Sequence, residues 1–175
     1  MKRAESRPDL SQEEVRELFD YREDGNLLWK VKPNKSIPVG AVAGLKPTTK
    51  EKYRRVKIRG WDYALHRVVF LWHHGWLPKV VDHADQDKFN NKIENLRAAT
   101  IAQNTQNVNA SPRGKVPYKG ITYRPEKKMP WIVELRCNGK RVIHQSCKTL
   151  VEAKMIVKEA RRYFHREFAA FEDDC

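Results

Sequence analysis

The sequence predicts an α+β chain of two small domains, the second a three-stranded antiparallel sheet packed on one helix. Short runs of alternating apolar and polar residues are joined by glycine-containing turns, a pattern typical of β-hairpins. Three segments begin with Ser or Thr followed three residues later by Glu or Gln, the sequence signature of a helix start. Residues 109–117 hold two Pro, one Gly and one Ser, which indicates a linker between domains.

Composition argues against several broad classes of protein. The chain has 175 residues, of which 40% are hydrophobic, 10% aromatic and 33% charged. No apolar run approaches the ~18 residues that a membrane span needs, and residues 1–10 lack the apolar core of a signal peptide. The three cysteines form no CxxC pair, so neither a disulfide framework nor a cysteine zinc site is expected. We therefore expect a cytoplasmic protein with reduced thiols and no membrane partner.

The net charge of +13 is unevenly distributed. Residues 1–44 carry 8 basic and 8 acidic residues, residues 45–110 carry 12 and 6, and residues 111–175 carry 15 and 8. The whole excess thus lies beyond residue 44. So large a positive charge on a small chain favours nucleic acid as the partner.

The N-terminal half contains helices, a hairpin and a proline-rich loop. We expect a helix from Ser11, a turn at Asp24-Gly25, a strand over 27–31, a loop over 33–50, a hairpin of strands 53–58 and 61–65, and a helix over 66–74 that ends at Gly75. The basic side chains on or near the hairpin are expected to contact DNA. They are Arg54, Arg55, Lys57 and Arg59.

The residues best suited to chemistry follow this hairpin. An apolar strand over 78–83 ends in Asp82-His83, a polar loop covers 84–92, and a helix is expected from Thr100 to about residue 108. A neutral His is a good base near pH 7. Asp carboxylate and Asn carbonyl oxygens are hard ligands that suit Mg²⁺ or Mn²⁺ rather than zinc. Asn104, in the first turns of that helix, lies where phosphate is favoured.

These residues together resemble a known family. The Asp82-His83 pair, the stretch Asn90-Asn91-Lys92-Ile93-Glu94-Asn95-Leu96-Arg97 and the pair Gln103-Asn104 resemble the ββα-metal motif of HNH endonucleases, in the Asp-His…Asn…Asn form of phage and intron homing endonucleases. The resemblance implies that His83 is the general base and that Asn95 holds the His-bearing strand through side-chain hydrogen bonds. It also implies that Asp82 and Asn104 bind a single divalent cation, and Arg97 is expected to face the phosphates.

The C-terminal part predicts a separate binding domain. Strands are expected over 118–123, 131–137 and 140–145, the last two joined by the type I′ turn Asn138-Gly139, followed by a helix from Thr149. This pattern resembles the DNA-binding domain of plant ethylene-response (APETALA-type) factors, which reads DNA with its sheet. We expect the basic residues Lys154, Lys158, Arg161 and Arg162 of the helix to be solvated. The expected DNA contacts are Lys119, Arg124, Glu134, Arg136 and Arg141.

The sequence therefore favours a metal-dependent DNA endonuclease of the homing type that acts on double-stranded DNA. A non-catalytic, sequence-specific DNA-binding regulator on a nuclease scaffold is the main alternative, and an RNA-binding protein is a weaker one. No dimer motif and no obligatory protein partner are evident, so a monomer is expected. The expected domains are an N-terminal region of the nuclease domain (1–50), the nuclease core (51–108), a linker (109–117), a DNA-binding domain (118–171) and an acidic tail (172–175).

Overall fold

The computed structural model describes residues 7–44, 53–107 and 116–169. The chain forms two compact units, residues 1–99 and residues 100–175, called here the first and second units. The boundary lies between Ala99 and Thr100, before the linker expected at 109–117, most of which lies outside the described residues together with the acidic tail. The predicted helix at Thr100 consequently belongs to the second unit.

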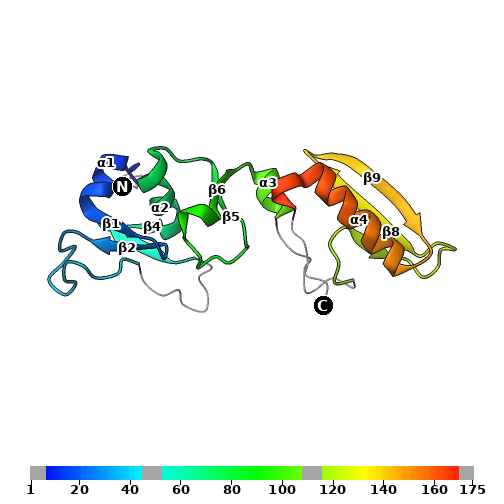
Figure 1. The fold of residues 1–175 in the computed structure, drawn as a ribbon, viewed down its shortest axis with the longest axis horizontal. Helices are drawn as coiled ribbons and strands as arrows, with labels where there is room; N and C mark the ends of the chain where they lie inside the picture. Colours follow the sequence, from blue (N-terminus) through cyan, green and yellow to red (C-terminus); the bar gives the residue numbers. More distant parts are fainter. Residues whose placement is uncertain (1–6, 45–52, 108–115, 170–175) are drawn as a thin grey trace, which may run out of the picture. The chain divides into compact units, whose positions relative to one another are not determined.

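The first unit consists of three separate two-stranded antiparallel sheets and two α-helices (Figure 1). Its first helix begins after Ser11, whose hydroxyl accepts the backbone N–H of Glu14 at 3.1 Å, as the sequence predicts. The sheets pair β1 with β2, β3 with β4, and β5 with β6. The elements are α1 (Gln12–Leu18), β1 (Phe19–Arg22), β2 (Asn26–Trp29), β3 (Arg55–Ile58), β4 (Trp61–Ala64), α2 (Leu65–His74), β5 (Val80–His83), the 3₁₀ helix η1 (Ile93–Asn95) and β6 (Leu96–Ala99).

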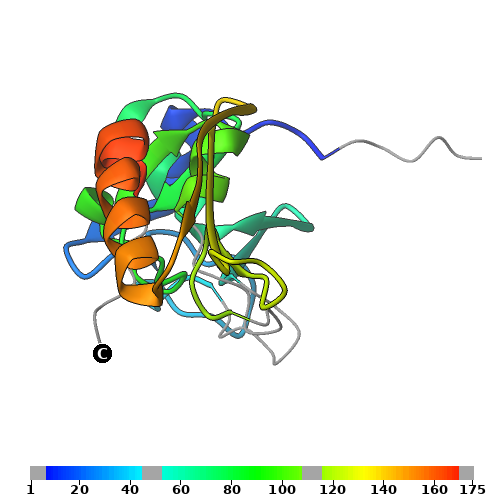
Figure 2. The same ribbon diagram turned by 90° about the vertical axis from the view of Figure 1, so that its right-hand side faces the viewer.

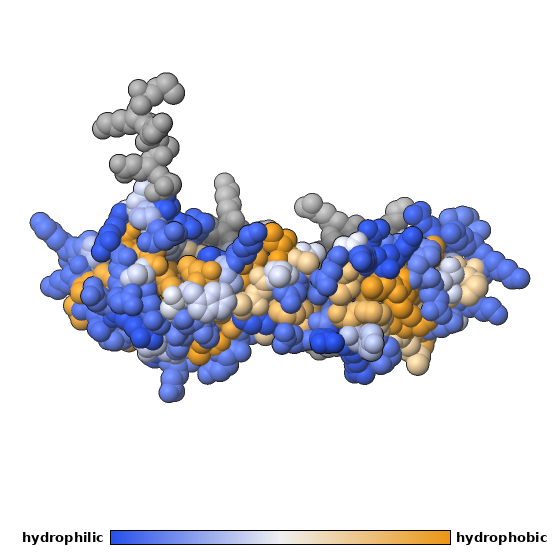
Figure 3. Space-filling model, turned by 90° about the horizontal axis from the view of Figure 1, so that it is seen from above, coloured by the Kyte–Doolittle hydropathy of each residue, from blue (hydrophilic) through white to orange (hydrophobic). Residues whose placement is uncertain are grey.

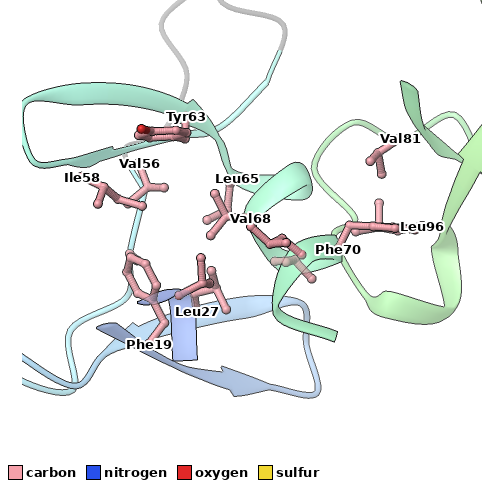
Figure 4. Close-up of a cluster of buried hydrophobic side chains, with 14 of the residues drawn as sticks. Phe19, Leu27, Val56, Ile58, Tyr63, Leu65, Val68, Phe70, Val81 and Leu96 are labelled. Carbon is pink, nitrogen blue, oxygen red and sulfur yellow. The ribbon is translucent and has the colours of Figure 1, made fainter. Parts of the chain in front are cut away.

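One hydrophobic core joins all three sheets of the first unit to α2 (Figure 4). Phe19 and Leu27 enter it from the β1–β2 hairpin, and both are fully buried. Leu65 and Val68 enter it from α2, while Val81 and Leu96 bring in the β5–β6 ribbon and complete the cluster. The β5–β6 ribbon, whose first strand ends in Asp82-His83, is therefore attached to a continuous core. This attachment holds the backbone of these polar residues in place.

Two strands of this unit were not predicted from the sequence. β1 follows α1 without a break, because Phe19 is both the C-cap of the helix and the first strand residue. β6 has the sequence Leu-Arg-Ala-Ala, with weak intrinsic strand preference, and is defined by its pairing with β5. The strand expected over 27–31 is β2, which ends at Trp29.

The second unit contains the predicted three-stranded antiparallel sheet, in the order β7-β8-β9, with α4 lying against one face (Figure 2). Asn138 and Gly139 both have positive φ, 50° and 77°, as the predicted type I′ turn requires. Val133, Ala153 and Cys147 are fully buried between sheet and helix. The elements are α3 (Ile101–Gln106), β7 (Ile121–Tyr123), β8 (Trp131–Cys137), β9 (Lys140–Cys147), α4 (Leu150–His165) and the 3₁₀ helix η2 (Arg166–Phe168).

The face drawn in Figure 3 is mostly hydrophilic, with hydrophobic residues exposed in places. None of the helices in the described ranges has both the length and the apolar character needed to cross a lipid bilayer.

Candidate active site

The β5–β6 ribbon positions the residues singled out by the sequence. In its antiparallel register Asp82 is opposite Arg97 and His83 is opposite Leu96. Successive side chains of a strand point to opposite faces, so Asp82 and His83 have different neighbours although they are adjacent in sequence. Asp82 is 5% exposed and His83 is 4% exposed. Polar groups so deeply buried need polar partners, and both have them.

The partner of Asp82 is Arg97. The Nε and Nη2 atoms of Arg97 donate to the same oxygen, Oδ2 of Asp82, at 3.0 and 2.9 Å. The two side chains are only 20% and 6% exposed, so water screens this ion pair weakly. The predicted contact of Arg97 with phosphate stays a prediction, and the structure shows that this guanidinium already serves the carboxylate of Asp82.

The partner of His83 is Asn91, to which the sequence analysis gave no role. The Nε2 atom of His83 lies 3.0 Å from Oδ1 of Asn91. Asn91 is 2% exposed, and its buried amide has its hydrogen-bond partner in the imidazole. A sequence signal for this residue exists only in the Asn-rich stretch 90–95, which does not distinguish a turn residue from a partner of the base.

Asn95 acts on the loop that follows His83. Its Nδ2 donates to Oδ1 of Asp85 and to the carbonyl oxygen of Asn90, both at 2.8 Å, and its Oδ1 accepts the N–H of Asp85 at 3.0 Å. Burial alone would raise the pKa of Asp85, but hydrogen bonds from Asn90 and Asn95 outweigh it and lower the pKa. These bonds hold the loop that directly follows His83, and this is the role that the structure gives to the Asn95 side chain.

Two aromatic rings lie beside the imidazole of His83. The ring centroid of His66, on α2, lies 5.0 Å away, and that of Tyr53 lies 6.1 Å away in a stacked arrangement. Burial, together with the neighbouring His83 and Arg67, lowers the pKa of His66 to about 3. His66 is therefore neutral at physiological pH. His73 and His74, also on α2, contact the rings of Tyr21 and Phe70 instead.

The donor chemistry at Asp82 fits a hard divalent cation, because it offers a buried carboxylate. Within residues 7–44, 53–107 and 116–169, no three His, Cys, Asp or Glu side chains gather into a metal-binding group. Asn104, the second predicted ligand, lies on α3 in the second unit, where the capping box of Thr100 and Gln103 is formed as predicted. Its role as a ligand stays a prediction from the sequence.

Of the hairpin residues expected to contact DNA, Arg54 is used internally. It donates to Oδ1 of Asn26 at 2.6 Å and to the carbonyl oxygen of Ala43 at 3.1 Å, and its burial lowers its pKa. The expected contact of Arg54 with DNA stays a prediction, for a guanidinium that is half-buried and already has two internal acceptors. Arg55 and Lys57 alternate with buried residues along β3 and are exposed.

The tip of the same hairpin carries Arg59, whose side chain is 72% exposed and pairs with Glu14 at 2.7 Å. Its guanidinium is therefore accessible but already has an acidic partner. DNA contact by Arg55, Lys57 and Arg59 stays a prediction.

The open face of the second-unit sheet carries a cluster of charges around Glu134. Its carboxylate lies 3.1 Å from Arg136, 3.9 Å from Arg141 and 3.7 Å from His144. A hydrogen bond from Arg136, together with the charge of that group and of Arg141, lowers the pKa of Glu134. Arg136 and Arg141 retain 64% and 53% of their side-chain exposure, so this face can meet a polyanion.

Two other basic residues of the second unit have internal partners. Lys119 donates from Nζ to the carbonyl oxygens of Thr105 and Gln106, at the C-terminal end of α3, where a cation is favoured. Arg161 was expected to be solvated, but it is 5% exposed and donates to the carbonyl oxygen of Lys119 at 2.7 Å. Arg124, directly after β7, is exposed. Lys119 thus has a structural role, and its DNA contact stays a prediction.

Comparison with known proteins finds two similarities. Residues 63–106, which span β4 to α3 and include Asp82 and His83, match the family model described as HNH endonuclease. This match supports a nuclease, a hydrolase acting on DNA. The chain is also similar to Protein 3.8 of Escherichia phage T7, with 29% identity over 112 residues that cover 62% of this chain and 91% of that protein. No solved structure matches the chain significantly.

Proposed function

We propose that the protein is a divalent-metal-dependent DNA endonuclease of the homing type with His83 as its general base. One observation carries the proposal. Within the segment that matches HNH endonucleases, an adjacent Asp82-His83 pair is almost fully buried, and each side chain has at least one polar partner, Arg97 for Asp82 and Asn91 for His83. Buried, held side chains of this kind are typical of catalytic groups, because catalysis depends on fixed geometry.

The reaction would begin at the imidazole of His83. Because Oδ1 of Asn91 can only accept, the hydrogen bond at Nε2 places the ring proton on that atom and leaves the lone pair on Nδ1. Nδ1 would take a proton from a water molecule as its oxygen attacks the phosphorus atom of a DNA phosphodiester. The bond from phosphorus to the leaving ester oxygen then breaks, and that oxygen acquires a proton from solvent.

A divalent cation, Mg²⁺ or Mn²⁺, would supply positive charge at the leaving oxygen. Asp82 is the residue of the first unit that would hold it, and Asn104 is the second ligand that the family resemblance implies. The guanidinium of Arg97 now neutralises Asp82, so a cation bound at this carboxylate would share it with Arg97 or displace that side chain. Arg97 could then reach a phosphate, which would reconcile its position with its expected role.

The basic surfaces would hold the duplex. Arg55 and Lys57 of β3 and the open face of the second-unit sheet are exposed and carry most of the predicted contacts. The resemblance of this sheet and α4 to the APETALA-type domain supports sequence-specific readout by Arg136 and Arg141 in a DNA groove. A DNA-binding unit joined to a nuclease unit is what supports the homing type.

The test is cleavage of supercoiled plasmid that carries candidate phage target sequences, with Mg²⁺ or Mn²⁺. We expect nicked product that disappears with a chelator and falls by about 10²- to 10⁴-fold in His83→Ala. His74→Ala is the matched control, because His74 is exposed on α2 and its ring lies against that of Phe70. Linear product would show that both strands are cut.

The alternative is a non-catalytic DNA-binding regulator. It predicts tight, salt-sensitive DNA binding without cleavage in either metal. Competition between duplex DNA and RNA at matched salt separates the RNA-binding alternative, which predicts preference for RNA.

A further inference from the structure

Asn91 has the properties of a residue that controls the imidazole of His83. It is one of the largest fully buried side chains in the described structure, and it is the only polar one among them. Burying an amide is costly unless it is hydrogen-bonded, and its Oδ1 is bonded to Nε2 of His83 at 3.0 Å. An amide oxygen cannot donate, so this contact favours the tautomer with its proton on Nε2.

The backbone of Asn91 is held by the turn between β1 and β2. Gly25, in that turn, has φ of +85°, and a Cβ added there would lie 2.5 Å from the carbonyl carbon of Asn91 and from the nitrogen of Lys92. Both contacts are with backbone atoms, which cannot rotate away as a flexible side chain could. The absence of a side chain at Gly25 is therefore what lets the turn touch the Asn91–Lys92 peptide directly.

A second contact from the same hairpin supports the segment. The hydroxyl of Tyr21, on β1, accepts the backbone N–H of Ile93 at 3.1 Å. Tyr21 and Gly25 thus contact both sides of Lys92 from a hairpin that lies outside the matched residues 63–106. The hairpin thus positions the backbone that carries the Asn91 amide. The amide in turn is hydrogen-bonded to the imidazole of His83.

We propose that Asn91 is the positioning residue that selects the Nε2–H tautomer of His83, and that the β1–β2 turn at Gly25 holds Asn91 in place. The inference rests on the proposed function of His83 as general base, since it says how that base is prepared. It assigns to Asn91 a direct contact with the base. Asn95, which the family resemblance expects to hold the His-bearing strand, bonds Asp85 and Asn90 in the loop that follows His83.

The first experiment reads the tautomer itself. In the full chain labelled with ¹⁵N, long-range ¹H–¹⁵N spectra distinguish a protonated from an unprotonated ring nitrogen, and His83→Gln identifies the signals of His83. We expect wild type and Asn91→Asp, which keeps an acceptor oxygen, to show the proton on Nε2. Asn91→Leu, similar in size but without an acceptor, should show a mixture of tautomers. A folded Asn91→Leu protein with unchanged His83 signals overturns the proposal.

Kinetics supply the second readout. We expect Asn91→Leu to lower kcat for plasmid nicking by about 100-fold with little change in KM, and Asn91→Asp to recover at least part of that loss. Equal losses in both variants, with unchanged tautomers, contradict the proposal. Should wild type cleave no DNA, the spectra still decide the role of Asn91, whereas the proposed nuclease function fails.

The role of the turn is tested by Gly25→Ala against Gly40→Ala. Gly40 has a similar φ of +81°, but a Cβ there meets nothing within 4 Å, so both variants carry similar backbone strain and only one moves Asn91. We expect Gly25→Ala to lower kcat by about 10-fold and to alter the His83 signals, and Gly40→Ala to change neither. Equal effects of the two variants overturn this part of the proposal. If Asn91→Leu does not fold, Gly25→Ala, which displaces Asn91, still tests whether Asn91 controls the tautomer.

Discussion

The β5–β6 ribbon of the first unit and the open sheet face of the second unit both display paired charges, but in opposite environments. In the ribbon, Asp82 is almost fully buried and Arg97 is the cation paired with it. On the sheet, Glu134 is 38% exposed and lies among Arg136, Arg141 and His144. Chemistry requires side chains held in one geometry, whereas binding a flexible polyanion favours charges that remain solvated and adjustable. The difference in burial thus matches the two proposed tasks, catalysis at the ribbon and DNA binding at the sheet.

The largest expected effect comes from removing the buried carboxylate. Asp82→Ala leaves the guanidinium of Arg97 largely buried without its partner, which should cost about 2–3 kcal/mol of unfolding free energy, less than for a fully buried pair because Arg97 is 20% exposed. Metal-dependent cleavage should fall by at least about 100-fold. Urea unfolding and plasmid nicking measure the two effects.

The matched variant is Glu134→Ala, which breaks the exposed cluster on the sheet. We expect no measurable change in the urea midpoint, because exposed ion pairs contribute little. Similar destabilisation by both substitutions would remove the distinction between the two regions.

The next largest effect concerns the pH dependence of stability. The unfolded chain protonates His66 near pH 6.5, whereas burial lowers the pKa of His66 in the folded state to about 3. The unfolded state therefore binds the extra proton, and stability is lost as the pH falls from 6.5 towards 3, by up to about 1.4 kcal/mol per pH unit. His66→Leu should flatten this dependence in urea unfolding measured at several pH values.

The pH dependence has a counterpart in the second unit, where burial also lowers the pKa of His165. His165 should act in the same direction, so His66→Leu flattens the curve only in part, and His165→Leu should remove a further component. An unchanged pH dependence in His66→Leu would show that His66 is protonated similarly in both states.

A smaller effect is expected from the exposed arginines of the sheet. Arg136→Ala or Arg141→Ala should weaken DNA binding by about 10-fold and reduce the slope of log Kd against log salt by about 1, because each removes one charge near the phosphates. Since neither belongs to the proposed catalytic set, kcat at saturating DNA should stay the same. Titrations at several salt concentrations measure the slope. A lowered kcat with an unchanged slope would contradict the prediction that these arginines act in DNA binding.

The smallest expected effect compares two neighbours in sequence. Arg54→Ala should destabilise the first unit by about 1 kcal/mol and leave the salt slope unchanged, since its guanidinium holds Asn26 and Ala43. Lys57→Ala should leave stability unchanged and reduce the slope by about 1, since Lys57 is exposed on β3. Unfolding and salt titrations on both variants give the comparison, which the reverse pattern would contradict.

The elements that the sequence predicts well are those with local signals. The caps at Ser11, Thr100 and Thr149 and the turn at Asn138-Gly139 all form as predicted, because a few adjacent residues determine them. β1 and β6 were missed because their signals are not local. β1 continues directly from a helix, and β6 depends on its partner strand.

The functional side chains show the same division. The positions of Asp82 and His83 at the end of a strand follow from the pattern of residues around them. The partner of His83 does not follow from that pattern, because Asn91 reaches it through a tertiary contact. The contact of Arg54 with Asn26 is likewise tertiary. The sequence gives the charge of a basic residue but not its hydrogen-bond acceptors. For this reason the internal contacts of Arg54, Lys119 and Arg161 were not predicted.

The contact between Gly25 and the Asn91–Lys92 peptide also bears on engineering. A designer who transplants only residues 63–106 into another scaffold would carry over the acid, the imidazole and the asparagines, but not the hairpin that braces them. Such a chimaera would contain all residues of the motif, but the position of its imidazole would be less well fixed. If Gly25 has the role proposed above, a graft that keeps Tyr21 and Gly25 together with the ribbon retains the contacts that hold the Asn91–Lys92 peptide.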